Sequence, residues 1–277
     1  MGVLGIIIQT EFGLPIHTEM FDPKLIKFEQ MDTSLTSGFI TALTMFAKEY
    51  DMELGHIKFR QDVSDIYGVN MIIQKKGIYL ILCFVEPYVY HEVVKEKIEW
   101  IYERILQKYE KTVANGQMIQ LKDSEKVYIG DILQDLYIKA ILTANKDQLD
   151  SKLGKFFLEH VGLYGVSINS FDNSILYFSG IAEETFKLYL NNMGRRSSII
   201  EDFEVIDSYI SIPEYQAMRV YAVNPGVKFE IQDIMTNLPD KTVSLYYYLI
   251  ADPALEIQPV INELMELLNP IFFEKRE

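Results

Sequence analysis

The sequence is poor in cysteine and in long apolar runs. Its single cysteine, Cys83, forms no intramolecular disulfide, which is typical of proteins from a reducing compartment. No apolar run approaches the roughly 20 residues that a membrane-spanning helix needs. The N-terminal segment also lacks the basic and long apolar regions of a signal peptide. We therefore expect a soluble, cytoplasmic protein with no transmembrane segment.

The sequence also lacks the motifs that mark common catalytic sites. It contains no glycine-rich phosphate loop, no dinucleotide-binding fingerprint and no nucleophile elbow. Cys83 lies inside an apolar run, where a small buried hydrophobe is expected rather than a nucleophile. The four histidines do not show the spacing of a metal site: His17, His56, His91 and His160. These absences predict that the protein is not an enzyme and needs no metal or cofactor.

Basic residues are few compared with acidic ones. The chain has 26 Lys and Arg against 40 Asp and Glu, which gives a net charge of −14. Nucleic acids and anionic lipid surfaces are polyanions, so this charge opposes binding to either. We expect no nucleic-acid partner. A macromolecular partner, if there is one, should present a basic patch.

The 277 residues provide enough apolar material for two domains. In the first half, the pattern predicts a hairpin, a helix, three strands and a long helix. The expected ranges are 3–9 and 14–21 for the hairpin, 32–50 for the helix, 56–61, 69–74 and 78–85 for the strands, and 87–115 for the long helix.

The helix expected at 32–50 follows the N-cap candidates Asp32-Thr33-Ser34. Its apolar residues are spaced three and four apart, which indicates one apolar face. They are Leu35, Phe39, Ile40, Leu43, Phe46 and Ala47. We expect this face to pack on the sheet.

The second half repeats the same order of elements. Strands are expected at 165–169, 174–179, 209–212, 218–223 and 243–250, with helices at 182–193 and from Asp252-Pro253 onward. Gly5 and Gly165 begin similar strands 160 residues apart, and Glu86-Pro87 and Asp252-Pro253 follow similar strands 166 residues apart. A shared order with a small change of offset predicts two copies of one unit.

We expect the first domain at residues 1–145, including an extra amphipathic helix at about 124–145. A polar linker is expected at 146–160, and the second domain at 161–277. Each domain should be an α+β unit in which helices flank a five-stranded antiparallel sheet. The strands are apolar along their whole length, so either both faces are covered or one face meets a partner.

The order β-β-α-β-β-β-α in both halves, with Gly5 at its start and Glu86-Pro87 before the long helix, resembles the longin domain and, more loosely, the roadblock domain. The arrangement is similar to tandem longin subunits of complexes that regulate small GTPases. The resemblance implies a non-enzymatic interaction platform, a regulator or scaffold that binds a small Ras-like GTPase or another longin or roadblock protein. Pairing within one chain or as a homodimer stays open.

Six residues are candidates for partner contacts. Tyrosine and arginine are enriched in interface hot spots, and arginine pairs grip carboxylates or phosphates. The candidates are Tyr88, Tyr90, Arg195, Arg196, Tyr246 and Tyr248. For the tyrosines the alternative is a core position. For the arginines it is a solvated loop after a helix.

A sensory module is the competing functional hypothesis. Ligand-binding domains of the GAF, PAS and profilin-like types also combine a central antiparallel sheet with flanking helices, and a small molecule binds between them. Such sensors usually feed an output domain, and the sequence shows none.

Overall fold

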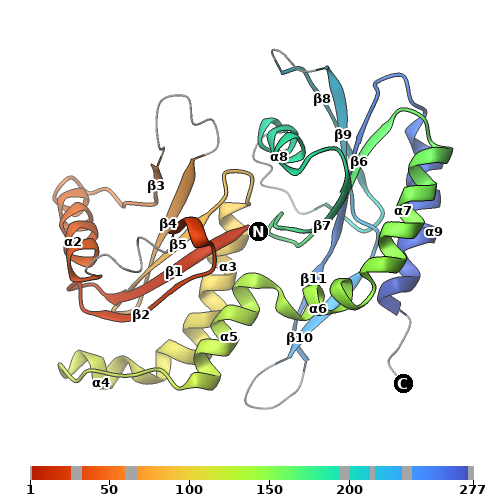
Figure 1. Cartoon of the computed structure of the whole chain (residues 1–277). Helices are drawn as coiled ribbons and strands as arrows, with labels where there is room; N and C mark the ends of the chain where they lie inside the picture. The colour runs from red at the N-terminus through yellow and green to blue at the C-terminus, as the bar shows by residue number, and fades with distance from the viewer. Residues whose placement is uncertain are drawn as a thin grey trace. The chain divides into compact units, whose positions relative to one another are not determined.

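The computed structural model describes residues 2–25, 33–59, 68–193, 200–212, 216–232 and 239–273 (Figure 1). The chain divides into two compact units, Met1–Gln134 and Asp135–Glu277. Each unit contains a five-stranded antiparallel sheet together with helices. The α+β class and the two antiparallel sheets are therefore confirmed.

The sheet of the first unit has the order β2-β1-β5-β4-β3. Its strands are β1 (Val3–Thr10), β2 (Pro15–Met20), β3 (His56–Phe59), β4 (Val69–Lys76) and β5 (Tyr79–Val85). The helical elements are η1 (Pro23–Leu25), α2 (Thr33–Glu49), α3 (His91–Ile101), η2 (Tyr102–Leu106), η3 (Gln107–Tyr109), α4 (Glu110–Ala114) and α5 (Asp123–Gln134).

Helices cover both faces of this sheet, which explains its apolar strands. Side chains alternate along β5, and Leu80, Leu82 and Phe84 pack in one core cluster with Ile40 of α2. Cys83 points to the opposite face, where the charge of Lys97 on α3 acts on its thiol. A strand that is buried on both sides gains nothing from polar residues at alternate positions.

The sheet of the second unit has the order β7-β6-β12-β9-β8, which is the same topology. Its strands are β6 (Leu163–Asn169), β7 (Ile175–Gly180), β8 (Val205–Ile210), β9 (Met218–Val223) and β12 (Tyr246–Ala251). The helices are α6 (Leu136–Ala144), α7 (Lys146–Glu159), α8 (Glu183–Asn192) and α9 (Ile257–Phe273), and β10 (Lys228–Gln232) pairs with β11 (Pro239–Ser244).

The first hairpins of the two units match hydrogen bond by hydrogen bond at an offset of 160 residues. In the first unit the backbone donor–acceptor pairs are Thr10–Leu14, Gly13–Thr10 and Phe21–Leu4. In the second they are Ser170–Ser174, Asn173–Ser170 and Ile181–Tyr164. Both first strands also shift register at the same place, between Ile8 and Gln9 and between Ile168 and Asn169. The units therefore share backbone geometry as well as strand order.

The segments Glu86-Pro87 and Asp252-Pro253 form turns, whereas both were expected to begin helices. Val89 donates to the carbonyl of Glu86, and Leu255 donates to that of Asp252, so each proline lies in a turn. The helices begin later, at His91 in α3 and Ile257 in α9.

The segment expected as a linker at 146–160 is instead helix α7, which buries Leu149, Leu153 and Phe156. The extra helix expected at 124–145 is two helices, α5 and α6, because Asp135 between them adopts a left-handed conformation with φ of 51°. Along the chain, the boundary between the two compact units falls between Gln134 and Asp135, so α6 belongs to the second unit.

Two strands of the second unit lie where one was expected. The segment at 243–250 is divided at Leu245 between β11 and β12. Phe229 on β10 packs against Phe272 of α9, with ring centroids 5.6 Å apart, and against Tyr137 of α6 at 6.3 Å. These ring contacts attach the two-stranded sheet to the helices of its unit.

None of the helices in the described part of the chain has both the length and the apolar content that crossing a bilayer requires.

Candidate functional site

The structure describes four of the six expected contact residues. Tyr88 is buried and its hydroxyl donates to the Glu86 carboxylate, and Tyr90 is the half-buried N-cap residue of α3. Tyr246 and Tyr248 are buried in β12. Arg195 and Arg196 lie outside the described residues. The role of these six residues in partner binding stays a prediction.

The tyrosines of β12 alternate between the faces of the sheet, as expected. Tyr247 donates to Asn269 of α9 at 2.8 Å, and burial raises its pKa. Tyr246 and Tyr248 lie on the opposite face. Because Ile250 shares their face and pairs with Gly165, which borders Phe186 of α8, this is the α8 side of the sheet.

The fold brings together two of the four scattered histidines. The rings of His56 on β3 and His91 on α3 are 5.6 Å apart, and His91 Nε2 lies 3.3 Å from Asn70 Nδ2. No group of three or more His, Cys, Asp or Glu side chains that could hold a metal ion occurs within the described ranges.

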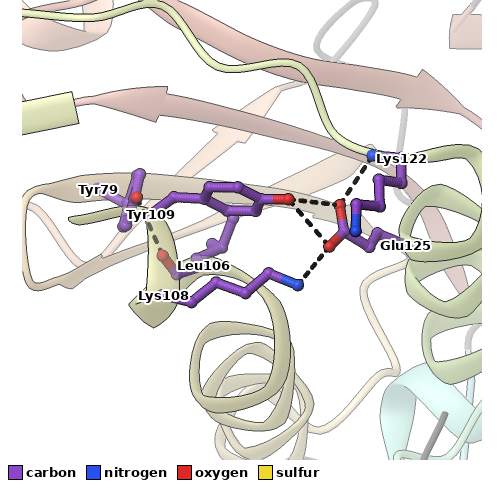
Figure 2. Close-up of polar contacts among 6 residues, drawn as sticks. All are labelled: Tyr79, Leu106, Lys108, Tyr109, Lys122 and Glu125. Atoms are coloured by element: carbon purple, nitrogen blue, oxygen red, sulfur yellow. Dashed lines mark hydrogen bonds and ion pairs between the residues drawn. The ribbon is translucent and has the colours of Figure 1, made fainter. Parts of the chain in front are cut away.

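Glu125 is the centre of the polar cluster shown in Figure 2. Its buried carboxylate pairs with Lys108 and accepts from the Tyr109 hydroxyl at 3.1 Å and from the Lys122 backbone at 2.8 Å. Burial alone would raise the pKa of Glu125, but the hydrogen bonds from Lys108, Lys122 and Tyr109 lower it below its ordinary value. The cluster joins η3 to the start of α5 and has a structural role.

Figure 2 also shows how a backbone carbonyl is hydrogen-bonded at the point where the expected long helix is interrupted. The π-helical turn η2 interrupts the regular ladder after α3, and the buried Tyr79 hydroxyl donates to the Leu106 carbonyl at 3.0 Å (Figure 2). A side chain of β5 thereby caps a carbonyl of this irregular segment.

Among the side chains of α2 that the structure describes, those of one side attach the helix to the sheet. Ile40 and Ser37 are buried, and Gln9 Nε2 of β1 donates to the Ser37 carbonyl at 3.4 Å and to Thr41 Oγ1 at 3.3 Å. The β1–β2 turn lies beside the same stretch, because a Cβ on Gly13 would come within 3.0 Å of Thr41 Oγ1. Figure 1 shows α2 next to this end of the sheet.

The other side of α2 exposes large apolar side chains. Phe39 is 58% exposed, Phe46 is 60% exposed and Tyr50, directly after the helix, is 60% exposed. The half-buried Leu43 lies between them in sequence. We call Phe39, Leu43, Phe46 and Tyr50 the α2 seam. The expectation of a single buried apolar face is wrong for this helix, because only Ile40 of the described positions in that set is buried.

Phe12, Leu14, Met45 and Met52 are further exposed apolar side chains of the first unit. Aromatic side chains present about 150–250 Å² each, so the exposed parts of Phe39, Phe46 and Tyr50 together expose on the order of 300–450 Å² of apolar area. The largest apolar patch of a typical monomer is about 300–600 Å², and one side of a stable interface buries about 800 Å². The seam is therefore comparable to the largest apolar patch of a typical monomer, which is often functional, and would supply the apolar part of an interface.

Helix α2 ends in an acidic segment. Met52 donates to the Ala47 carbonyl at 2.9 Å and Asp51 to that of Lys48 at 3.0 Å, which is a Schellman motif with Asp51 in the left-handed conformation at φ of 53°. Glu49, Asp51 and Glu53 are exposed, and we call them the acidic end. The C-terminal pole of the helix adds further negative potential there.

The second unit supplies an internal comparison. Helix α8 lies at the same point of the topology as α2, between the second and third strands. It carries Glu183, Glu184 and Lys187, and Lys187 pairs with Glu183 at 2.9 Å. Helix α2 has no charged residue from Thr33 to Ala47. The fold does not require an uncharged helix at this point, so the seam is a property of the first unit alone.

The sequence carries one signal for the exposed seam, because fifteen consecutive positions of α2 have no charged residue. The apolar spacing that predicted one buried face does not include this signal.

Compared with known proteins, the chain matches no protein-family model and no curated protein.

Proposed function

We propose that the protein is a non-enzymatic protein-interaction platform. The observation that carries this proposal is the α2 seam, an exposed apolar stripe on a helix whose counterpart in the second unit is charged. Exposed apolar area of this extent favours association, because burying it removes it from water.

The proposed partner is a small Ras-like GTPase or another longin or roadblock protein, and the chain would act as its regulator or scaffold. What supports this partner class is the element order β-β-α-β-β-β-α, which is the basis of the resemblance to longin and roadblock domains. The first unit has this order, and the second unit has it with the hairpin β10–β11 inserted before its last strand. Families of this kind act through surfaces, so the proposal assigns no catalytic residue.

The test is affinity capture from native lysate with the full chain as bait, followed by mass spectrometry. The wild type and the double variant Phe39→Gln/Phe46→Gln are compared, because glutamine keeps helix propensity and removes the aromatic surface. Leu158→Gln on α7 is the matched control, since Leu158 is also a highly exposed apolar residue.

We expect the wild type and the control to retain a Ras-like GTPase or a longin or roadblock protein, and the double variant to lose it. Nucleotide-exchange and hydrolysis assays on the recovered GTPase would then separate regulation from scaffolding. A wild-type capture that retains no protein partner would contradict the platform, and a metabolite screen for thermal stabilisation would test the sensory alternative.

A further inference from the structure

The spacing of the α2 seam indicates what shape of partner fits it. Phe39, Leu43, Phe46 and Tyr50 follow one another at intervals of four, three and four residues. This is the a/d spacing of helices that pack side by side with knobs in holes. The seam spans three helical turns, or about 16 Å. A second helix of at least that length is the complementary surface.

The charges at the end of the seam indicate the polarity of that helix. Glu49, Asp51 and Glu53 are exposed, and Lys48 is the only base among residues 48–53. Lys48 Nζ lies 3.9 Å from Glu11, a carboxylate that also pairs with Lys75. The remaining part of α2 is uncharged. A partner is therefore attracted if it carries positive charge at the end of the helix that meets the acidic end.

We propose that the α2 seam binds an amphipathic α-helix of a partner protein, with apolar residues at a/d spacing and lysine or arginine at the end that lies over Glu49, Asp51 and Glu53. This inference rests on the proposed platform function and specifies the segment of the partner that is recognised. Binding of this kind recognises a helix by its apolar anchor residues and by the charge that flanks them.

Two other occupants of the seam are disfavoured by the same charges. A second copy of the chain would bring either its own acidic end, in a parallel pair, or the uncharged part of α2, in an antiparallel pair. The parallel pair brings three carboxylates against the single Lys48, which already lies 3.9 Å from Glu11, and the antiparallel pair brings no cation from α2. An anionic lipid surface would be repelled by the three carboxylates and by the net charge of −14.

The test uses the full-length protein and two synthetic peptides of about 20 residues, long enough to be partly helical in isolation. Both peptides have leucine at the a and d positions. One carries four lysines at its end and the other four glutamates. Fluorescence anisotropy measures the affinity of each peptide for the wild type, for Phe46→Gln, for Glu49→Gln/Asp51→Asn/Glu53→Gln and for the control Leu158→Gln.

We expect the lysine peptide to bind the wild type at least about tenfold more tightly than the glutamate peptide. Phe46→Gln should weaken the lysine peptide at least about tenfold, as loss of an aromatic anchor does. The triple variant should remove the preference between the peptides, and Leu158→Gln should change nothing. Circular dichroism and thermal unfolding of every variant check that each is folded.

Several results would overturn the inference. Equal affinity for the two peptides would show that the acidic end does not select charge, and absence of binding by the lysine peptide would show that the seam does not take such a helix. Sedimentation that reveals a dimer lost in Phe46→Gln would identify a second copy as occupant. Flotation with phosphatidylcholine vesicles that depends on Phe46 would identify a lipid surface.

Failure of the inference and failure of the platform are distinguishable. A GTPase captured from lysate by the wild type, without peptide binding, would leave the platform standing and overturn the helix proposal. Peptide binding without any captured partner would overturn the platform and leave the helix-binding role of the seam standing.

Discussion

At the scale of single residues, the thiol of Cys83 is the simplest to test. Its side chain is completely buried in β5, and burial raises its pKa to about 12, although the charge of Lys97 acts in the opposite direction. At about pH 8 only about one thiol in 10⁴ would be ionised, and the thiolate is the reactive form. We expect a disulfide reagent such as DTNB to leave the native protein unmodified and to label one thiol in guanidinium chloride. Rapid labelling of the native protein would contradict the burial of β5.

Glu125 is the residue whose ionisation should matter most for acid stability among those in Figure 2. Its pKa is lowered in the folded protein from the ordinary value of 4.5, so its charged form stabilises the fold above about pH 4.5 and this contribution is lost as the pH falls further. We expect Glu125→Gln to destabilise the protein by about 1–2 kcal/mol near pH 7, because hydrogen bonds to a charged acceptor are lost.

Urea unfolding at a series of pH values measures this effect. The stability difference between wild type and Glu125→Gln should be largest near neutral pH and should shrink below about pH 4.5, where both carry an uncharged side chain. Glu103→Gln is the matched control, since Glu103 is an exposed acid on the same run of helix. A difference that does not vary with pH would show that the carboxylate charge is not what the cluster uses.

At the scale of elements, the two hairpins place Gly13 and Asn173 at the same position with positive φ, 83° and 72°. A left-handed residue with a Cβ costs about 1 kcal/mol unless it is glycine or, to a lesser extent, asparagine. We therefore expect Asn173→Ala to be less stable than Asn173→Gly by about 1 kcal/mol.

Urea midpoints of the two variants measure this difference. At the exposed helical position Lys155 in α7, the order should reverse, with alanine more stable than glycine by about 1 kcal/mol. Asn173→Ala equal in stability to Asn173→Gly would mean that the turn relaxes out of the left-handed conformation.

Much of the element order could be predicted because apolar periodicity and turn residues are local signals. The hairpins, the strands at β4, β5 and β9 and the helix at α2 follow directly from them. The turns at Glu86-Pro87 and Asp252-Pro253 could not be placed from the sequence alone, because proline suits both a turn and the first position of a helix. Helix α7 was not predicted because its exposed side is mostly polar, with Leu158 as an exception, and three buried residues stabilise the helix.

The candidate surface was harder to predict than the fold. The apolar residues of α2 occupy most of its circumference, so spacing alone does not say which of them the sheet buries. The structure assigns Ile40 to the core and leaves Phe39 and Phe46 exposed. For the same reason Tyr246, Tyr247 and Tyr248 looked alike in the sequence, whereas all three are buried and at least Tyr247 finds its partner inside its own unit. Exposure depends on packing between distant segments, which a single sequence does not record.

At the scale of the whole molecule, the net charge of −14 should act in opposite directions on stability and on binding. Excess negative charge destabilises the compact state by self-repulsion, and salt screens it, since the Debye length falls from about 30 Å at 0.01 M to about 8 Å at 0.15 M. We expect the melting temperature of the free protein to rise over this range.

The rate of association with the lysine peptide should fall over the same range, because screening also removes the attraction between the acidic chain and a basic partner. The dissociation rate should change less, since the apolar contacts of the seam set it. Stopped-flow fluorescence and thermal unfolding in the same buffers measure both effects. If the stability responds to salt but the association rate does not, the peptide contacts a surface that lies away from the acidic residues. The net charge would then act on folding without steering the partner.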